Sequence, residues 1–366
     1  MKIVVTGTRG IPGILGGVET HCEELFPRIA AMGHDITVIR RSCYVTPGNR
    51  ISEYKGVHLK DIFAPRKKSL EAIVHTFLAV VAARRMNPDI LHIHAIGPSI
   101  MAPLARLLGM KVVVTHHGPD YDRGKWGRLA KTVLKAGERM GVRYSHKIIV
   151  ISKVIASLIA EKYHRLDSAL IYNGVPTPIP VQSSDFIQSL GLTSGRYVVA
   201  VGRFVPEKNF HQLISAFSAS GLERQGFRLA IAGDADHPDH YSESLKAQAR
   251  EHHVILTGFI KGEPLAQLLS HAALFVLPSS HEGLPISLLE AMGHKQDVLV
   301  SDIPANRLPQ LMQDDFFPVG NEKALADALR RKLAAARKGR EYDLSPYNWD
   351  TIAHQTIELY SSLLYG

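Results

Sequence analysis

Short apolar runs alternate with longer helical segments along this chain of 366 residues. A first series of apolar runs of strand length lies at residues 2–6, 35–40, 89–94, 111–115 and 147–151. A second series follows at residues 197–203, 228–234, 254–258, 272–278 and 297–301. Continuous apolar runs are typical of parallel strands that helices bury on both faces. The pattern therefore predicts two α/β domains, joined at a proline-rich stretch, residues 176–184.

Length and composition agree with a two-domain globular enzyme. The chain is longer than a single hydrophobic core usually supports, and its 45% hydrophobic and 21% charged residues are ordinary for soluble proteins. Two cysteines, Cys22 and Cys43, indicate a reducing compartment without a disulfide framework. The N-terminus lacks a signal-peptide pattern, and the longest apolar helical run, residues 70–83, is too short to span a bilayer. A cytoplasmic location is expected.

Charge is distributed unevenly along the chain, whose net charge is +9. Residues 1–180 carry 26 lysines and arginines against 13 carboxylates, a net of +13, and the remainder has a net of −4. This asymmetry indicates an anionic partner for the first half. No helix-turn-helix, zinc-finger or aromatic RNA-binding pattern favours nucleic acid, so an anionic membrane surface is the stronger candidate.

The N-terminal strand leads into a glycine-rich loop, residues 7–17, and then a helix at 18–32. This strand, the glycine-rich loop, the helix and the next strand follow each other as at the start of a Rossmann-like domain. The glycine spacing departs from the dinucleotide fingerprint, and Arg40 and Arg41 stand where an acidic residue would hold a ribose. We therefore expect no nicotinamide cofactor. Gly16 and Gly17 would let a ligand approach the backbone closely, unless they only form a tight turn.

The second half contains a stretch suited to an anionic, hydroxyl-rich ligand, residues 281–293. Glu282 and Glu290 flank a Gly-Leu-Pro turn, and Pro285 suits the first position of a helix. Such a helix would aim free backbone N–H groups at the preceding loop. The amides suit phosphate or hydroxyl oxygens, and the carboxylates suit pairs of hydroxyls.

Two cations lie in a loop that leaves the strand at residues 197–203. Arg203 and Lys208 would stand at the carboxyl edge of the sheet, where open α/β sheets bind ligands. Together they suit a diphosphate, whose charge grows as a glycosidic bond to it breaks. The simpler alternative is a surface ion pair with Glu207.

Taken in order, these motifs resemble glycosyltransferase family 4. The resemblance covers nearly the whole chain and rests on Gly16-Gly17-Val18-Glu19, Thr115-His116-His117-Gly118, Asn173-Gly174-Val175, Gly202-Arg203 through Lys208-Asn209, Gly233-Asp234 and the pair Glu282 and Glu290. It implies retaining, metal-independent enzymes with the α/β GT-B fold, in which two Rossmann-like domains face each other. The expected divisions are an acceptor-side domain at 1–178, a nucleotide-sugar domain at 179–345, and a C-terminal helix at 346–366 that crosses back to the first domain.

The resemblance also implies roles for individual residues. Arg203 and Lys208 would hold the donor diphosphate, Glu282 the transferred sugar and Glu290 the ribose. Glu19 would lie on the acceptor side, and His117 near both the sugar and the acceptor. The donor would also contact Gly16, Gly17, Gly258, Gly283 and Leu284. Pro285 lacks a backbone donor that some family members have, which leaves the donor sugar open.

Two other chemistries are disfavoured. Glu282 and Glu290 resemble the acid and nucleophile of a glycosidase, but a diphosphate leaving group needs no general acid. His92, His94, His116 and His117 suggest a metal site. No cysteine or paired carboxylate completes a ligand set, and the family works without metal, so no metal is expected.

A basic stripe lies on the helix expected at residues 125–143. Six cations recur at three- and four-residue spacing, at Lys125, Arg128, Lys131, Lys135, Arg139 and Arg143. A solvated helix face is one interpretation. The other is contact with an anionic membrane or a lipid-diphosphate acceptor, to which residues 66–68 and 84–85 would add.

The expected function is transfer of a sugar, with retention, from a nucleotide-diphosphate sugar to a glycan or a polyprenyl-diphosphate-linked acceptor. UDP-sugars are favoured. The N-terminal block resembles that of bacterial enzymes of surface polysaccharide synthesis, such as lipopolysaccharide or capsule. Two alternatives stay open, a nucleotide-sugar 2-epimerase of the GT-B type and a non-catalytic nucleotide-sugar-binding assembly subunit.

Overall fold

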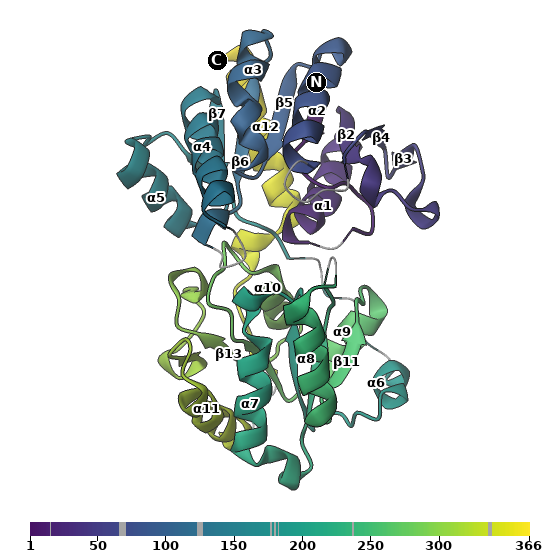
Figure 1. Cartoon of the computed structure of the whole chain (residues 1–366), viewed down its shortest axis with the longest axis vertical. Helices are drawn as coiled ribbons and strands as arrows, with labels where there is room; N and C mark the ends of the chain where they lie inside the picture. The colour runs from purple at the N-terminus through teal and green to yellow at the C-terminus, as the bar shows by residue number, and fades with distance from the viewer. Residues whose placement is uncertain are drawn as a thin grey trace. The chain divides into compact units, whose positions relative to one another are not determined.

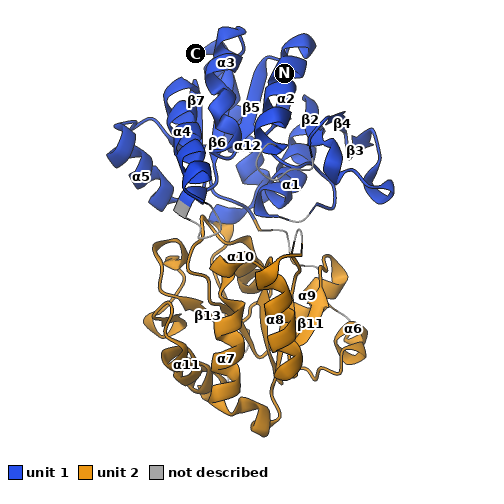
Figure 2. Cartoon of the chain, in the orientation of Figure 1, with its two compact units in different colours: residues 1–174, 346–366 blue, residues 175–345 orange. Residues whose placement is uncertain are grey.

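A computed structural model describes residues 1–14, 16–65, 71–122, 127–175, 178, 181, 183–235, 238–335 and 339–366. The chain forms two compact units, each a parallel sheet with helices. Unit 1 comprises Met1–Gly174 and Pro346–Gly366, and unit 2 comprises Val175–Ser345 (Figure 2). The α/β class expected from the apolar runs is confirmed, since those runs form buried strands in both units.

Unit 1 is built on an eight-stranded sheet with the order β3-β4-β2-β1-β5-β6-β7-β8. Its strands are β1 (Lys2–Thr6), β2 (Asp35–Arg41), β3 (Glu53–Tyr54), β4 (Val57–Ile62), β5 (Ile90–His94), β6 (Val112–His116), β7 (Lys147–Val150) and β8 (Ala169–Leu170). Neighbouring strands are parallel except for the short β3, which is antiparallel to β4. The chain runs outward from β1 to β4 and then restarts at β5, so the topological switch lies between β1 and β5.

Helices cover the sheet of unit 1 (Figure 1). They are α1 (Gly17–Ala31), α2 (Glu71–Met86), α3 (Ala102–Leu107), α4 (Arg128–Tyr144), α5 (Lys153–Tyr163) and α12 (Trp349–Tyr365). The C-terminal α12 packs on α1 and shares the hydrophobic core of unit 1. A Cβ at Gly174 would lie 2.4 Å from Cδ2 of Trp349, so the absent side chain makes room for the indole. The return of the C-terminal helix to the first domain is thus confirmed.

Unit 2 has a six-stranded parallel sheet with the order β11-β10-β9-β12-β13-β14. Its strands are β9 (Tyr197–Val201), β10 (Arg228–Ala232), β11 (Ile255–Gly258), β12 (Leu274–Leu277), β13 (Val298–Ser301) and β14 (Phe316–Phe317). Its helices are α6 (Asp185–Ser189), α7 (Phe210–Ser220), α8 (His240–Glu251), α9 (Glu263–Ser270), α10 (Ile286–Gly293) and α11 (Glu322–Ala335). The switch in strand order here lies between β9 and β12.

Two expected boundaries need correction. Pro285 is not the first helical residue but the N-cap of α10, and its backbone is extended, with ψ at 110°. A residue before the first helical turn needs a non-helical ψ, and proline supplies the fixed φ there without requiring a helical ψ. Strand β6 extends to His116, so this histidine lies inside the sheet and not in the loop that follows it.

Within the described residues, none of the helices combines the length and apolar character that a bilayer crossing requires.

Candidate active site

The topological switch of unit 2 brings two loops together. Strands β9 and β12 pair directly, so the chain segments that leave their carboxyl ends are neighbours. Arg203 lies just after β9, and Lys208 ends the short 3-10 helix Pro206–Lys208. Glu282 lies between β12 and α10. Ligands of open α/β sheets bind at such a switch point, so the cations and the carboxylate predicted from the sequence share the expected edge.

Lys208 and Glu282 form an ion pair, with 2.5 Å between Nζ and Oε1. Their side chains are only 15% and 11% exposed. Lys208 thus reaches a carboxylate on a different loop, and this pair is largely shielded from solvent, unlike the surface pair with Glu207 considered from the sequence. A largely desolvated cation of this kind attracts an anionic ligand that can compete with the carboxylate.

Backbone contacts fix the two loops of unit 2 against each other. Ser280 donates its backbone N–H to the carbonyl of Glu207 at 2.9 Å. Asn209 donates from Nδ2 to the carbonyl of Pro278 at 3.1 Å. Asn209 adopts the left-handed conformation, with φ at 50°, which asparagine tolerates better than most residues. Lys208 and Glu282 are therefore presented by a cross-linked pair of loops, which suits a preorganised site.

Glycines line the carboxyl edge beside this pair. A Cβ at Gly233 would lie 1.8 Å from the carbonyl oxygen of Gly202, and the N–H of Gly233 donates to the carbonyl of Gly258 at 2.9 Å. The chains leaving β9 and β10 can approach so closely only because Gly233 has no side chain. A Cβ at Gly258 would meet no described atom within 4 Å, but its φ of 71° favours glycine there.

Helix α10 carries the remaining residues predicted for the donor. Gly283 and Leu284 lie in the loop that leads to its N-terminus, and Leu284 is buried. Glu290 lies in the second turn of α10 and is partly exposed. All the residues of unit 2 predicted to bind the donor therefore stand in segments at or after the carboxyl ends of its strands.

The corresponding edge of unit 1 holds Gly16, Gly17 and Glu19. Glu19 is buried, and its Oε1 accepts hydrogen bonds from Thr8 Oγ1 and from the backbone and Nε of Arg9. Its Oε2 pairs with Nη2 of Arg9 at 3.0 Å. Gly16 has φ at 144°, and a Cβ there would lie 2.2 Å from Oε2 of Glu19. Glu19 therefore fixes the glycine loop, a role that the sequence does not reveal.

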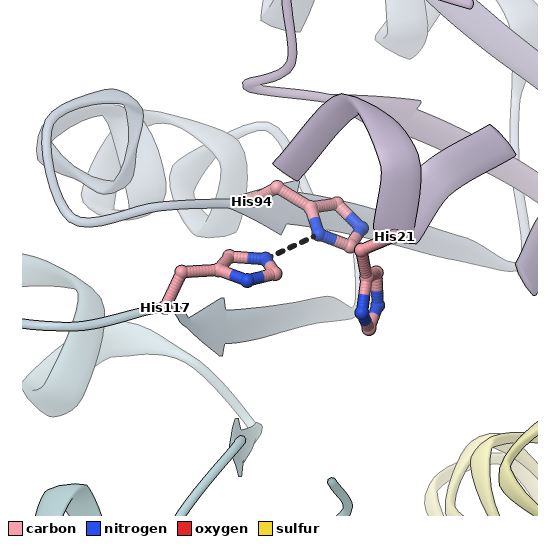
Figure 3. A group of neighbouring side chains, drawn as sticks. All are labelled: His21, His94 and His117. Atoms are coloured by element: carbon pink, nitrogen blue, oxygen red, sulfur yellow. Dashed lines mark hydrogen bonds between the residues drawn. The ribbon is translucent and has the colours of Figure 1, made fainter. Parts of the chain in front are cut away.

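Three histidines converge next to the switch point of unit 1 (Figure 3). His21 comes from α1, His94 from the end of β5 and His117 from the residue after β6. Nδ1 of His94 and Nε2 of His117 lie 3.0 Å apart and share a hydrogen bond. Nδ1 of His21 lies 2.8 Å from Oδ1 of Asn173. The residue predicted to meet the sugar, His117, is thus held by a buried neighbour.

Burial keeps these imidazoles neutral. It lowers the pKa of His21 to about 4, and the hydrogen bond to Asn173 offsets this only in part. Burial, assisted by the neighbouring histidines, lowers the pKa of His94 and of His117 well below the usual range. At neutral pH the cluster therefore offers hydrogen-bond donors and lone pairs without positive charge.

The other two histidines considered for a metal site bond partners outside the cluster, although the ring of His92 lies 4.1 Å from that of His94 between centroids. His92 bonds Tyr360 of α12 and Thr115, and burial lowers its pKa to about 3. His116 accepts from the N–H of Gly118 and donates from Nε2 to Glu138 at 3.0 Å. The four-histidine grouping considered from the sequence therefore does not form, and His21 joins His94 and His117 in its place.

Helix α4 turns its cations outward. Arg128, Lys135, Arg139 and Arg143 are exposed and Lys131 is partly exposed, whereas Glu138 faces inward and is fully buried. Among the described residues, no carboxylate pairs with any of these five cations. Lys125 and residues 66–68 lie outside the described residues, so the continuity of the stripe at that end stays a prediction.

Sequence reasoning did not identify His21 and Asn173 as site residues. His21 lies four residues after Gly17 on α1. This spacing from the glycine loop is the only sequence signal that could have indicated a site residue there. Asn173 was noted only as part of a motif. Its contact with His21 joins residues 152 positions apart, which no local pattern can show.

Comparison with known proteins places family models on both units. The model described as Glycosyltransferase Family 4 matches residues 15–178. The model described as Glycosyl transferases group 1 matches residues 195–335. The two models cover complementary parts of the chain.

Two relatives and one solved structure match three quarters or more of the chain. A glycosyltransferase of Methanocaldococcus jannaschii is 25% identical, with 98% of each chain covered. GDP-mannose:cellobiosyl-diphosphopolyprenol alpha-mannosyltransferase of Komagataeibacter xylinus is 26% identical over 75% of this chain and 72% of its own. The structure of Anabaena HepE in complex with UDP-glucose has a TM-score of 0.79 at 17% identity, covering 98% of this chain and 99% of that one.

Proposed function

Because the chain is a glycosyltransferase that belongs to family 4 and has the GT-B fold, we propose that it transfers a sugar from a nucleotide-diphosphate sugar with retention of configuration. The donor is a UDP-sugar in this proposal, and residues of unit 2 bind it. The acceptor is a glycan or a lipid-linked glycan, and residues of unit 1 bind it. The observation that carries the proposal is the Lys208–Glu282 pair at the switch point of unit 2.

The donor assignment follows from the chemistry of that edge. Lys208 and Arg203 supply positive charge for a diphosphate, and Gly283 and Leu284 lie in the loop that leads to α10. When the diphosphate takes Lys208, the carboxylate of Glu282 is released to accept hydrogen bonds from sugar hydroxyls. Glu290, farther along α10, takes the ribose hydroxyls.

The proposed reaction exchanges one glycosidic bond for another. The bond between C1 of the sugar and the β-phosphate oxygen breaks, and a bond from C1 to the acceptor oxygen forms on the same face. A donor phosphate oxygen takes the acceptor proton. Lys208 and Arg203 stabilise the charge that develops on the diphosphate, which is the part of the barrier that fixed cations lower most.

The choice of UDP rests on similarity to a solved structure that contains a UDP-sugar. HepE, whose structure contains UDP-glucose, is similar to this chain throughout. The Komagataeibacter relative takes GDP-mannose and acts on a diphosphopolyprenol-linked acceptor. That relative supports the lipid-linked acceptor and makes GDP the first competitor to test. The exposed cations of α4 suit an anionic lipid diphosphate or the membrane that carries it, in surface polysaccharide synthesis.

A thermal-shift panel of UDP, GDP, dTDP and ADP tests the donor. A ligand at about 100 times its Kd stabilises a protein by roughly 2.7 kcal/mol, so the correct nucleotide should raise the melting temperature most. UDP is expected to give the largest shift. A panel without any shift would contradict nucleotide binding in unit 2.

Proton NMR of the sugar separates transfer from the two alternatives. A transferase yields a product whose anomeric configuration equals that of the donor, and it needs an acceptor. A 2-epimerase changes the nucleotide sugar when no acceptor is present, and a non-catalytic subunit leaves it intact under both conditions. An epimer, or an unchanged donor with every acceptor tried, would contradict the proposal.

A further inference from the structure

The hydrogen bond between His94 and His117 raises the question of which ring carries the shared proton. The bond joins Nδ1 of His94 to Nε2 of His117 over 3.0 Å. Each neutral imidazole has one N–H, so only one of the two nitrogens donates. The answer decides whether the remaining nitrogen of His117, Nδ1, is an N–H donor or a lone pair.

The surroundings of His94 distinguish the two arrangements. His94 is completely buried, and its Nε2 has no hydrogen-bond partner among the described residues. If His117 donated, the proton of His94 would sit on Nε2 as a buried N–H without an acceptor. If His94 donates, Nε2 is a bare lone pair. Orphaned buried N–H groups are rarer than acceptors lacking a partner, so the second arrangement has the lower free energy.

We infer that His94 donates its Nδ1–H to Nε2 of His117 and thereby holds His117 as the Nδ1–H tautomer. His94 is a positioning residue that acts through His117. His117 is the partly exposed member of the pair, and Figure 3 shows its other nitrogen on the ring edge away from His94. It therefore presents an N–H donor to a bound sugar oxygen, not a base.

This tautomer agrees with the proposed reaction, on which its catalytic consequence rests. A neutral His117 that donates from Nδ1 and accepts at Nε2 has no lone pair left for the acceptor proton. That proton must go elsewhere, and the donor phosphate oxygen is the base in the proposed step. The tautomer itself does not depend on that function, because it follows from the buried contacts of unit 1.

The same three histidines also resemble a metal site, since one nitrogen of each lies within 4.8 Å of the others. Histidines that ligate metal usually donate their other N–H to a protein oxygen. His21 meets this condition through Oδ1 of Asn173. His94 does not: coordination through Nδ1 would place its proton on the orphaned Nε2, and coordination through Nε2 would leave its Nδ1–H on a histidine nitrogen, not on an oxygen. The geometry therefore favours the hydrogen-bonded pair over a metal.

Long-range ¹H–¹⁵N NMR on the full chain labelled with ¹⁵N-histidine tests the tautomer directly. The signals of His117 are assigned as those lost in His117→Gln. We expect Nδ1 of His117 to be protonated and Nε2 to be bare, from pH 6 to 8. A protonated Nε2 on His117 would overturn the inference. So would tight binding of added Zn²⁺ through Nδ1 of His94, because that coordination requires Nδ1 to be bare.

Kinetics of two variants tests the positioning role. The Nδ2 of asparagine can donate from nearly the place of Nδ1 of histidine, so His94→Asn should keep most of the wild-type kcat. His94→Leu cannot donate and should lower kcat about tenfold to a hundredfold through misorientation of His117. In His94→Leu, the NMR spectrum should show His117 as a mixture of tautomers. Equal kcat in both variants, with both folded, would contradict the role.

The NMR spectrum and the kinetics separate the tautomer of His117 from the proposed sugar transfer. If the chain transfers no sugar, the NMR spectrum of the unmodified protein still reports the tautomer. His58→Leu is the control, because that histidine is exposed and lies outside the cluster. If His94→Leu does not fold, the wild-type spectrum alone decides.

Discussion

Lys208 and Glu282 form a nearly buried ion pair, so substituting either residue alone leaves one charge without its partner. Lys208→Met should lower kcat/KM for the nucleotide sugar by about 10²- to 10³-fold, because a fixed cation is lost at the leaving group. It should also destabilise the fold, since breaking a buried pair costs about 3–5 kcal/mol. Steady-state rates and urea unfolding measure the two effects.

A double variant separates stability from catalysis at this pair. Lys208→Met with Glu282→Gln removes both charges, so stability should recover while kcat/KM stays low. Lys295→Met is the matched control, because Lys295 forms an exposed pair with Glu341, and exposed pairs contribute about 0–1 kcal/mol. Recovery of kcat/KM in the double variant would contradict a role for Lys208 at the diphosphate.

Gly16 and Gly17 are neighbours that differ in how well they should tolerate a side chain. Gly16 has φ at 144°, and a Cβ there would strike the buried Glu19. Gly16→Ala should therefore lower the free energy of unfolding by about 1–3 kcal/mol. A Cβ at Gly17 meets no described atom within 4 Å, so Gly17→Ala should change stability by less than about 0.5 kcal/mol. Urea unfolding of both variants measures the difference, and equal losses would contradict this account.

Gly17→Ala also tests the close approach of the donor. If a ligand touches the backbone at Gly17, the added methyl should raise KM for the nucleotide sugar although the fold is unchanged. An unchanged KM would indicate that the donor does not contact the backbone at Gly17.

Among the helices, α4 carries exposed cations that suit an anionic surface. Replacing Arg128, Lys135 and Arg139 by glutamate should abolish sedimentation with vesicles that contain anionic lipid at low salt. Each cation near such a surface contributes about 1 kcal/mol, and the attraction is screened within about 10 Å at 0.1 M salt. The three side chains are exposed, so the fold should be preserved.

Neutral vesicles and high salt are the controls for α4. The unmodified protein should bind anionic vesicles at low salt and be released as salt rises. If it ignores anionic vesicles, or binds neutral ones equally, the cations of α4 form only a solvated helix face.

The apolar runs of the sequence predicted most elements because burial on both faces leaves a local signature. Lys2–Thr6 and Tyr197–Val201 are strands as expected. Helix starts were less predictable, since Pro285 serves equally well as N-cap or first residue. Spacing located Lys208 and Glu282 in their loops, but their pairing depends on β9 lying beside β12, which is a property of strand order and not of any local pattern.

At the scale of the whole molecule, buried histidines make stability depend on pH. Burial lowers the pKa of His21 and His75 to about 4 and that of His92 to about 3, from 6.5. Below about pH 6.5 these histidines therefore bind protons in the unfolded chain, whereas in the folded chain they stay neutral until a lower pH. Stability should be complete above about pH 6.5 and fall as pH drops toward 4, by up to 1.4 kcal/mol per unit of pKa shift.

Glu138 adds a second acid-sensitive contribution. Burial would raise its pKa, but hydrogen bonds from His116, Lys162 and Tyr163 outweigh burial and lower it to about 2. Its stabilisation is present above about pH 4.5 and is lost as pH falls toward 2. Melting temperatures measured from pH 8 to 4 should decline from about pH 6.5 downward, and a flat profile between pH 7 and 5 would contradict the buried neutral histidines.

The two-unit organisation could be predicted from the sequence, but the contacts of the histidine cluster could not. The two α/β series and the returning C-terminal helix follow from periodicity and from family resemblance. The histidine cluster does not, because His21, His94 and His117 come from three elements that only the folded sheet of unit 1 brings together. Motif order thus predicted the family, whereas the contacts of His94 and Glu19 required the structure.

The central claim is that the carboxyl edge of unit 2 binds the nucleotide diphosphate of the donor. Isothermal titration of UDP into the unmodified protein and into Glu290→Ala tests it most directly, with Lys295→Met as control. We expect binding by the unmodified protein and the control, and a loss of about tenfold or more in Glu290→Ala, equivalent to about 1.4 kcal/mol. Equal affinity in all three proteins would contradict it.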